Sequence, residues 1–120
     1  MSKQVIHGTC PSKSNSYRII KLPNGAYSLG KTAALRKYEK DFFIQCNIYR
    51  DANIEGYFEI YIDVFYPNQR SDLDNSLKVV LDCLQKVKAV KNDNKLVKIV
   101  ARKFLDKLNP RIEFILKEIS

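Results

Sequence analysis

Two aspartates and a lysine stand at a spacing that suits metal-assisted chemistry on a phosphate group. Asp72 and Asp74 lie at the start of a segment with helical periodicity, and Lys78 follows one helical turn after Asp74. Both carboxylates can converge near the first turn, where the helix dipole favours negative charge. Carboxylate oxygens are hard ligands that suit Mg²⁺, with Mn²⁺ as the alternative ion. Lys78 could stabilise charge that develops on a phosphate.

The same residues also have an ordinary structural explanation. Ser71 or Asp72 would be a helix N-cap, Asp74 a first-turn acid, and Lys78 its i, i+4 partner. A calcium-binding EF-hand loop is excluded, because the stretch that begins at Asp72 has no glycine at the sixth loop position and has Cys83 where the motif requires a glutamate.

A third carboxylate and the overall charge favour the metal-site interpretation. Asp93 lies in a polar turn just beyond the helix, where it is either an ordinary loop residue or free to fold back. The chain has 21 Lys and Arg against 13 Asp and Glu, a net charge of +8, which favours a polyanionic partner. Metal ions held by carboxylates let an acidic site approach a phosphodiester and lower the pKa of an attacking water. The residues therefore predict a magnesium site on a nucleic-acid-binding protein.

Histidine and cysteine usage excludes several other kinds of site. His7 is the only histidine, which excludes zinc sites built on several histidines and argues against a histidine-based nucleophilic triad. Cys10, Cys46 and Cys83 are odd in number and contain no Cys-x-x-Cys pair, so we expect buried, inert thiols. The chain has no apolar run near the ~20 residues of a membrane span and no apolar signal region at its start. We therefore expect an intracellular protein.

Periodicity predicts an α+β fold in one domain over residues 1–120, with a small mixed sheet of about four strands, an N-terminal hairpin and two α-helices. Helices are expected at 32–47 and 74–88, the second with Leu73, Leu77, Val80, Leu81, Leu84 and Val87 packed inward. Strands are expected at 4–7, 17–22, 26–29, 57–66, 97–105 and 111–119. Asn24-Gly25 predicts the turn of the hairpin, and the last two strands are expected to form an antiparallel pair.

In its central motif the chain resembles the RusA family of Holliday junction resolvases. That family has an Asp-Leu-Asp-Asn signature at a helix start, a lysine four residues after the second aspartate, and a third aspartate in the turn beyond the helix. The matching residues are Asp72, Asp74, Asn75, Lys78 and Asp93.

The resemblance extends to an N-terminal loop at 11–15, to Tyr17-Arg18 and to the order of elements along nearly the whole chain. The family often carries a longer arginine run before its signature, whereas this chain has Gln69 followed by Arg70.

The resemblance implies a homodimeric, Mg²⁺-dependent endonuclease that makes paired, symmetric cuts in a four-way DNA junction during recombination and repair. A two-fold junction offers two equivalent phosphates, and a C2 dimer can present one site to each. The implied metal ligands are Asp72, Asp74 and Asp93, with Lys78 on the phosphate and Asn75 as an orienting neighbour. The implied DNA contacts are Asn75, Arg70, Lys13, Asn15 and Arg18.

The resemblance also implies a DNA-associated cytoplasmic protein, with no membrane partner and no nucleotide cofactor; phage and prophage carriage is common in that family. Two alternatives stay open from the sequence. One is a branched-DNA-binding module of the same fold that does not cut, and the other is a less selective metal-dependent nuclease.

Overall fold

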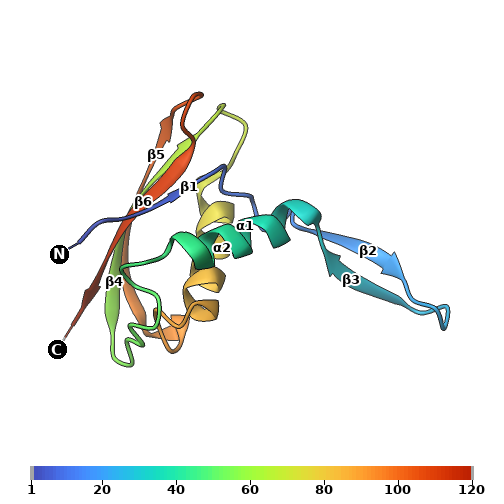
Figure 1. Ribbon diagram of the computed structural model, residues 1–120, viewed down its shortest axis with the longest axis horizontal. Helices are drawn as coiled ribbons and strands as arrows, with labels where there is room; N and C mark the ends of the chain where they lie inside the picture. Colours follow the sequence, from blue (N-terminus) through green and yellow to red (C-terminus); the bar gives the residue numbers. More distant parts are fainter. Residues whose placement is uncertain (1, 120) are drawn as a thin grey trace.

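The computed structural model describes residues 2–119 and shows a four-stranded sheet, two helices on one face of it, and a hairpin that projects away (Figure 1). The strands are β1 (Gln4–His7), β2 (Tyr17–Lys21), β3 (Tyr27–Lys31), β4 (Phe58–Tyr66), β5 (Leu96–Leu105) and β6 (Arg111–Glu118). The helices are α1 (Ala33–Gln45), α2 (Leu73–Lys86) and the short 3-10 helix η1 (Asp93–Lys95). The predicted α+β fold is confirmed.

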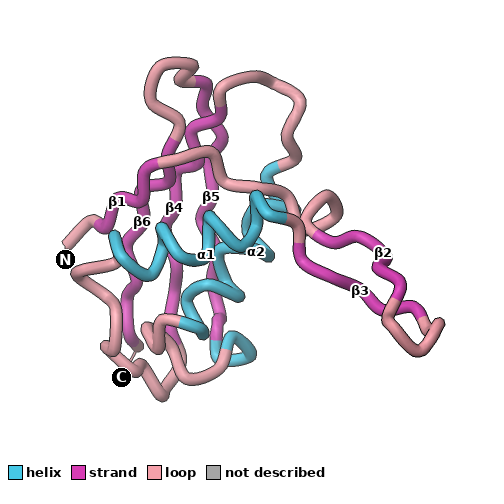
Figure 2. Tube along the Cα trace, turned by 45° about the vertical axis from the view of Figure 1, so that its right-hand side comes forward, coloured by secondary structure: helices cyan, strands magenta, loops and turns pink. Residues whose placement is uncertain are grey.

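Strand β4 is the centre of the sheet, whose order is β1-β6-β4-β5. Every second residue of β4, from Phe58 to Tyr66, is buried, as its period-two pattern predicts. In Figure 2, α1 and α2 lie across the four strands, so these buried side chains face the helices. The core of the protein therefore lies between β4 and the helix pair.

The predicted antiparallel pairing of segments 97–105 and 111–119 is wrong. Strand β5 pairs in parallel with β4, with Ile60 opposite Ile99, while β6 pairs antiparallel with β4, with Ile60 opposite Leu116. The two strands thus flank β4 rather than each other. The chain leaves β4 and returns through α2, so β5 starts at the same end of the sheet as β4, as in other crossover units.

Helix α1 begins at a clear cap and packs one apolar stripe on the sheet. Thr32 is the N-cap, and its side chain accepts a hydrogen bond from the backbone N–H of Leu35. The helix ends at Gln45, two residues before the predicted end, and Tyr49 then packs on Phe114 from the following turn, with ring centroids 5.7 Å apart. The helical spacing of Leu35, Tyr38, Phe42, Cys46 and Tyr49 predicts this stripe. All five residues lie in the core or pack against it, although Cys46 and Tyr49 lie beyond the end of the helix.

Helix α2 is rotated relative to the predicted orientation. Val80, Leu84 and Val87 are buried as expected, but the three leucines at 73, 77 and 81 are only partly buried. The positions that face the core instead are Ser76, Val79 and Cys83.

The three cysteines are free and buried, as predicted. Burial raises the pKa of Cys10 to about 12 and also raises the pKa of Cys46 and Cys83, which keeps the thiols protonated and unreactive. Within residues 2–119, neither α1 nor α2 has the length and apolar character that a membrane-crossing helix needs.

Phe42 and its neighbour Phe43 on α1 provide a matched test of this packing. Phe42 is fully buried and its ring lies 6.1 Å from that of Phe114, whereas Phe43 is 51% exposed. We expect Phe42→Ala to lower the free energy of unfolding by about 3–5 kcal/mol through lost burial and a residual cavity. Phe43→Ala should cost about 1 kcal/mol or less. Urea denaturation measures both, and equal losses would contradict this arrangement of α1.

Candidate active site

A buried pair of hydroxyl groups fixes the first turn of α2 against the end of β4. The Tyr66 hydroxyl donates a 2.6 Å hydrogen bond to Ser76 Oγ, and both residues are fully buried. Burial is also the main reason that the pKa of Tyr66 is raised, with the charges of Asp72 and Asp74 adding to it. Since a buried hydroxyl left without a partner is costly, this contact sets where α2 starts.

Two more segments hold the start of α2. The backbone N–H of Lys13 donates to the carbonyl of Asn75 at 3.2 Å, which attaches the N-terminal loop to the first turn of the helix. On the other side, Lys103 Nζ on β5 donates to the carbonyls of Ser71 and Gln69 at 2.6 and 3.1 Å. The loop that precedes the helix is therefore positioned by the sheet.

The carboxylates of Asp72 and Asp74 are exposed at this turn. Asp72 occupies the N-cap position with extended backbone, but its side chain accepts no capping hydrogen bond. Asp74 lies in the first helical turn, and among residues 2–119 neither aspartate takes part in a salt bridge. Both carboxylates are thus available to a ligand, and the structural role of a cap does not account for Asp72.

Lys78 is also exposed, one turn after Asp74 on the same side of α2. Within the described part of the chain it forms no salt bridge, so the i, i+4 pair with Asp74 that the spacing allows is absent. Its ammonium group is available to a phosphate.

Asp93 lies at the other end of α2. Its backbone N–H donates a 2.6 Å hydrogen bond to Gln85 Oε1, and Gln85 belongs to the last turn of the helix. Gln85 lies eleven positions after Asp74, about 16 Å along the helix axis. Across residues 2–119, no three His, Cys, Asp or Glu side chains gather closely enough to hold a metal ion. The structure thus brings Asp72 and Asp74 to one turn and leaves Asp93 apart.

The donor set at the start of α2 fits Mg²⁺ in part. This ion is commonly bound through one or two carboxylates while it keeps several waters. Asp72 and Asp74 supply two carboxylates at the start of the helix, and the atoms that they offer to a metal ion are all oxygens. Those two residues could hold the ion, and Asp93, the third predicted ligand, could join them only from another position or another chain.

The remaining predicted DNA contacts lie on segments that flank this turn. Asn15 and Arg18 are exposed on the N-terminal loop and on β2, Arg70 is exposed in the loop before α2, and Asn75 is half-buried in the first turn. Lys13 instead pairs with Asp82 at 3.1 Å, and this hydrogen bond raises the pKa of the lysine.

Three residues that shape the site are not apparent from the sequence: Ser76, Asp82 and Lys103. Ser76 accepts a hydrogen bond from Tyr66, and Lys103 donates to backbone carbonyls of the loop before α2. Asp82 forms an ion pair with Lys13, which lies 69 positions earlier in the chain. No local spacing signals such contacts, because each depends on how distant segments pack.

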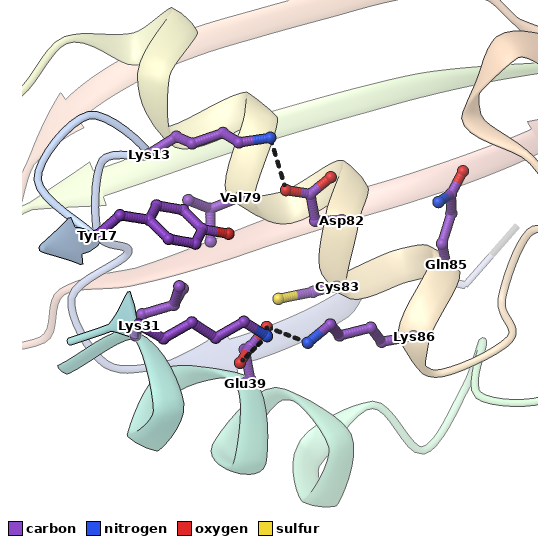
Figure 3. Close-up of a pocket in the computed structure, with 10 residues that line it drawn as sticks. Lys13, Tyr17, Lys31, Glu39, Val79, Asp82, Cys83, Gln85 and Lys86 are labelled. Carbon is purple, nitrogen blue, oxygen red and sulfur yellow. Dashed lines mark hydrogen bonds and ion pairs between the residues drawn. The ribbon is translucent and has the colours of Figure 1, made fainter. Parts of the chain in front are cut away.

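A cavity of about 350 Å³ lies beside the middle of α2, between the N-terminal loop, β3 and α1 (Figure 3). On its floor the Glu39 carboxylate lies between Lys31 and Lys86, at 3.0 and 2.6 Å. Burial works to raise the pKa of Glu39, but the hydrogen bonds from the two lysines outweigh it and leave the pKa lowered. This charged cluster fastens the base of the hairpin and α1 to α2.

Taken together, the fold and the site define a basic α+β protein with free carboxylates and a free lysine at a helix start, the groups that metal-assisted phosphodiester hydrolysis uses. The family model for endodeoxyribonuclease RusA matches residues 11–117. The chain belongs to the RusA endodeoxyribonuclease family, as its motif predicts. A comparison with curated proteins found no significant match. The roles of the individual site residues stay predictions.

Replacement of the two N-cap residues tests whether the Asp72 carboxylate is structural. Asp72→Ala should change the free energy of unfolding by less than about 0.5 kcal/mol, because its side chain accepts no capping hydrogen bond. Thr32→Ala is the control, since Thr32 does cap α1 and should cost about 1 kcal/mol. Chemical denaturation measures both. A loss at Asp72 as large as that at Thr32 would make the aspartate an ordinary cap.

Proposed function

We propose that this protein is a Mg²⁺-dependent endonuclease that resolves four-way Holliday junctions by paired, symmetric hydrolysis of phosphodiester bonds. Membership of the RusA family supports the DNA-cutting activity. The observation that carries the proposal furthest is that, within residues 2–119, Asp72 and Asp74 at the start of α2 and Lys78 one turn further on are exposed and form no salt bridge. Groups that stabilise the fold would be paired, whereas groups that receive a metal and a phosphate must be accessible.

Each of these residues has a role in the proposed reaction. Asp72 and Asp74 would hold Mg²⁺, or Mn²⁺ in its place, and the bound ion would polarise the scissile P–O bond and lower the pKa of a water. Lys78 would neutralise charge on the phosphate as the bond breaks. Asn75, whose backbone carbonyl accepts a hydrogen bond from the backbone N–H of Lys13, would help to orient the site beside the two aspartates. The net charge of +8 would draw DNA to this surface.

A homodimer follows from the symmetry of the substrate. Four-way junctions carry two equivalent scissile phosphates, and a C2 dimer presents one carboxylate site to each. Dimerisation would also supply a third carboxylate. Within one chain Asp93 is held at the far end of α2 by Gln85, so we propose that the Asp93 of a second copy completes the site formed by Asp72 and Asp74.

Replacement of Asp74 separates cutting from binding. We expect Asp74→Asn to lower the rate of junction cleavage by at least about a hundredfold, since a group that stabilises the reacting charge is lost. Binding to the junction should persist or tighten, because removal of a carboxylate charge does not weaken attraction to phosphates. Asp41→Asn is the control; it also removes one carboxylate, but from α1, where Asp41 pairs with Lys37.

The assay incubates the wild-type protein and both variants with a synthetic four-way junction or linear duplex, in Mg²⁺. A wild type that shifts the junction without nicking it would be a branched-DNA-binding module. Equal cutting of linear duplex would make it a general nuclease. Loss of binding together with cleavage in Asp74→Asn would assign the aspartate a structural role.

Subunit mixing tests the source of the third carboxylate. Asp72→Asn and Asp93→Asn should each be inactive alone. If Asp93 acts across the dimer, a mixed dimer contains one intact site and one doubly altered site. We therefore expect the mixture to regain nicking on one strand of the junction, as seen on a denaturing gel. If both carboxylates act within one chain, both sites of the mixed dimer are damaged and the mixture stays inactive.

A further inference from the structure

The hairpin formed by β2 and β3, residues 17–31, is an arm that extends away from the rest of the protein (Figure 1). It forms a two-stranded sheet separate from the main one. The whole chain measures 50 × 34 × 24 Å with a radius of gyration of 15.1 Å, against roughly 14 Å for a compact chain of this length. A two-stranded ribbon buries little apolar surface of its own, so the side chains of such an arm stay open to contact with another molecule.

One face of the arm carries three large apolar side chains that are open to solvent, with Lys21 beside them. Ile19 and Leu29 lie directly opposite each other in the register, and Tyr27 follows on the same face nearer the tip. Their exposed fractions are 73%, 70% and 70%. On the opposite face, Ile20 closes over Gly30, so this second face is partly covered. Exposed apolar groups of this size, gathered on one ribbon, mark an interaction surface.

Charge indicates which partner fits this surface. Arg18 and Lys21 lie on the arm, Lys31 at its base pairs with Glu39, and Glu39 is the first acidic residue of the chain. Two copies of so basic a ribbon would repel each other, whereas a polyanion would be attracted. Aromatic and aliphatic side chains between cationic ones suit nucleic acid in particular, because bases stack on rings and apolar wedges enter between base steps.

The base of the arm is attached to the turn that carries the aspartates. The backbone N–H of Thr32 donates to the carbonyl of Ser16 at 2.9 Å and closes the base, and the loop just before it bonds to Asn75 through Lys13. The Lys31 ion pair with Glu39 adds a second attachment. Each strand of the arm spans about 17 Å, so the arm reaches well beyond the site while its base stays fixed to it.

We propose that the arm lays Ile19, Leu29 and Tyr27 against unstacked bases at the branch point of a DNA junction, with Arg18 and Lys21 on the adjacent phosphates. This inference rests on the junction-resolving function proposed above. Unstacking a base costs least where the helix is already interrupted, as it is at a branch point. The arm thereby favours branched over linear DNA, which the carboxylate site by itself does not distinguish.

The double variant Ile19→Thr with Leu29→Thr tests the proposal, since threonine keeps the strand propensity and removes apolar surface. Affinities for a four-way junction and for linear duplex are measured at one salt concentration without Mg²⁺, and 2-aminopurine at the branch point reports unstacking. Wild-type protein should raise the 2-aminopurine fluorescence on binding. The variant should lose this rise and bind the junction at least about fivefold more weakly, with duplex affinity changed less than about twofold.

Two further variants accompany the measurement. Leu108→Thr, at a residue that is 95% exposed in the loop between β5 and β6, is the matched control and should bind like the wild type. Tyr27→Ser removes a ring near the tip, far from the core, and should also lose the fluorescence signal even if the double variant fails to fold.

The outcomes separate this inference from the proposed function. If the wild type prefers the junction and the arm variants keep both that preference and the fluorescence rise, the arm inference is overturned and the nuclease proposal stands. If the folded arm variants bind normally but sediment as monomers, the arm docks on a second copy instead. If the wild type itself shows no preference for the junction, both proposals fail.

Discussion

The buried hydrogen bond between Tyr66 and Ser76 is the contact on which the arrangement of the site depends. It joins the last residue of the central strand to the first turn of α2, and both hydroxyl groups are shielded from water. To separate them would leave two buried polar groups unsatisfied, at about 1–3 kcal/mol each. The helix can therefore start in only one place relative to β4, and Asp72 and Asp74 are carried to the end of that strand.

The same contact explains why α2 is rotated from its predicted orientation. With Ser76 facing the sheet, the positions that follow at helical spacing, Val80 and Cys83, must face it too. Leu73, Leu77 and Leu81 then move to the edge of the interface. Hydrophobicity alone predicts that these leucines are buried in the core and that Ser76 is exposed. Only the partner hydroxyl on β4 makes the serine favourable there, and that partner is not a local feature of the sequence.

Features that depend on local chemistry were predictable from the sequence. The alternation of β4, the Asn24-Gly25 turn and the start of α2 all follow from residue type and spacing. Features that depend on distant packing were not. The neighbour of β5 is decided by the crossover through α2, and the backbone N–H of Asp93 is held by the Gln85 side chain in the last turn of that helix.

The pairing of acids elsewhere on the surface indicates what kind of site the first turn of α2 is. Asp41, Asp63 and Asp82 each hold a cationic partner at 3.1 Å or less, as expected in a chain with surplus lysine and arginine. Asp74 and Lys78 have the spacing for such a pair, yet across residues 2–119 neither forms a salt bridge. Exposed pairs are worth little to stability, so fold energetics neither require nor forbid this one. Two free carboxylates on a cationic protein would weaken its attraction to DNA, and in the proposed function a bound cation would reverse that effect locally, so that the affinity for DNA would depend on occupancy of the site.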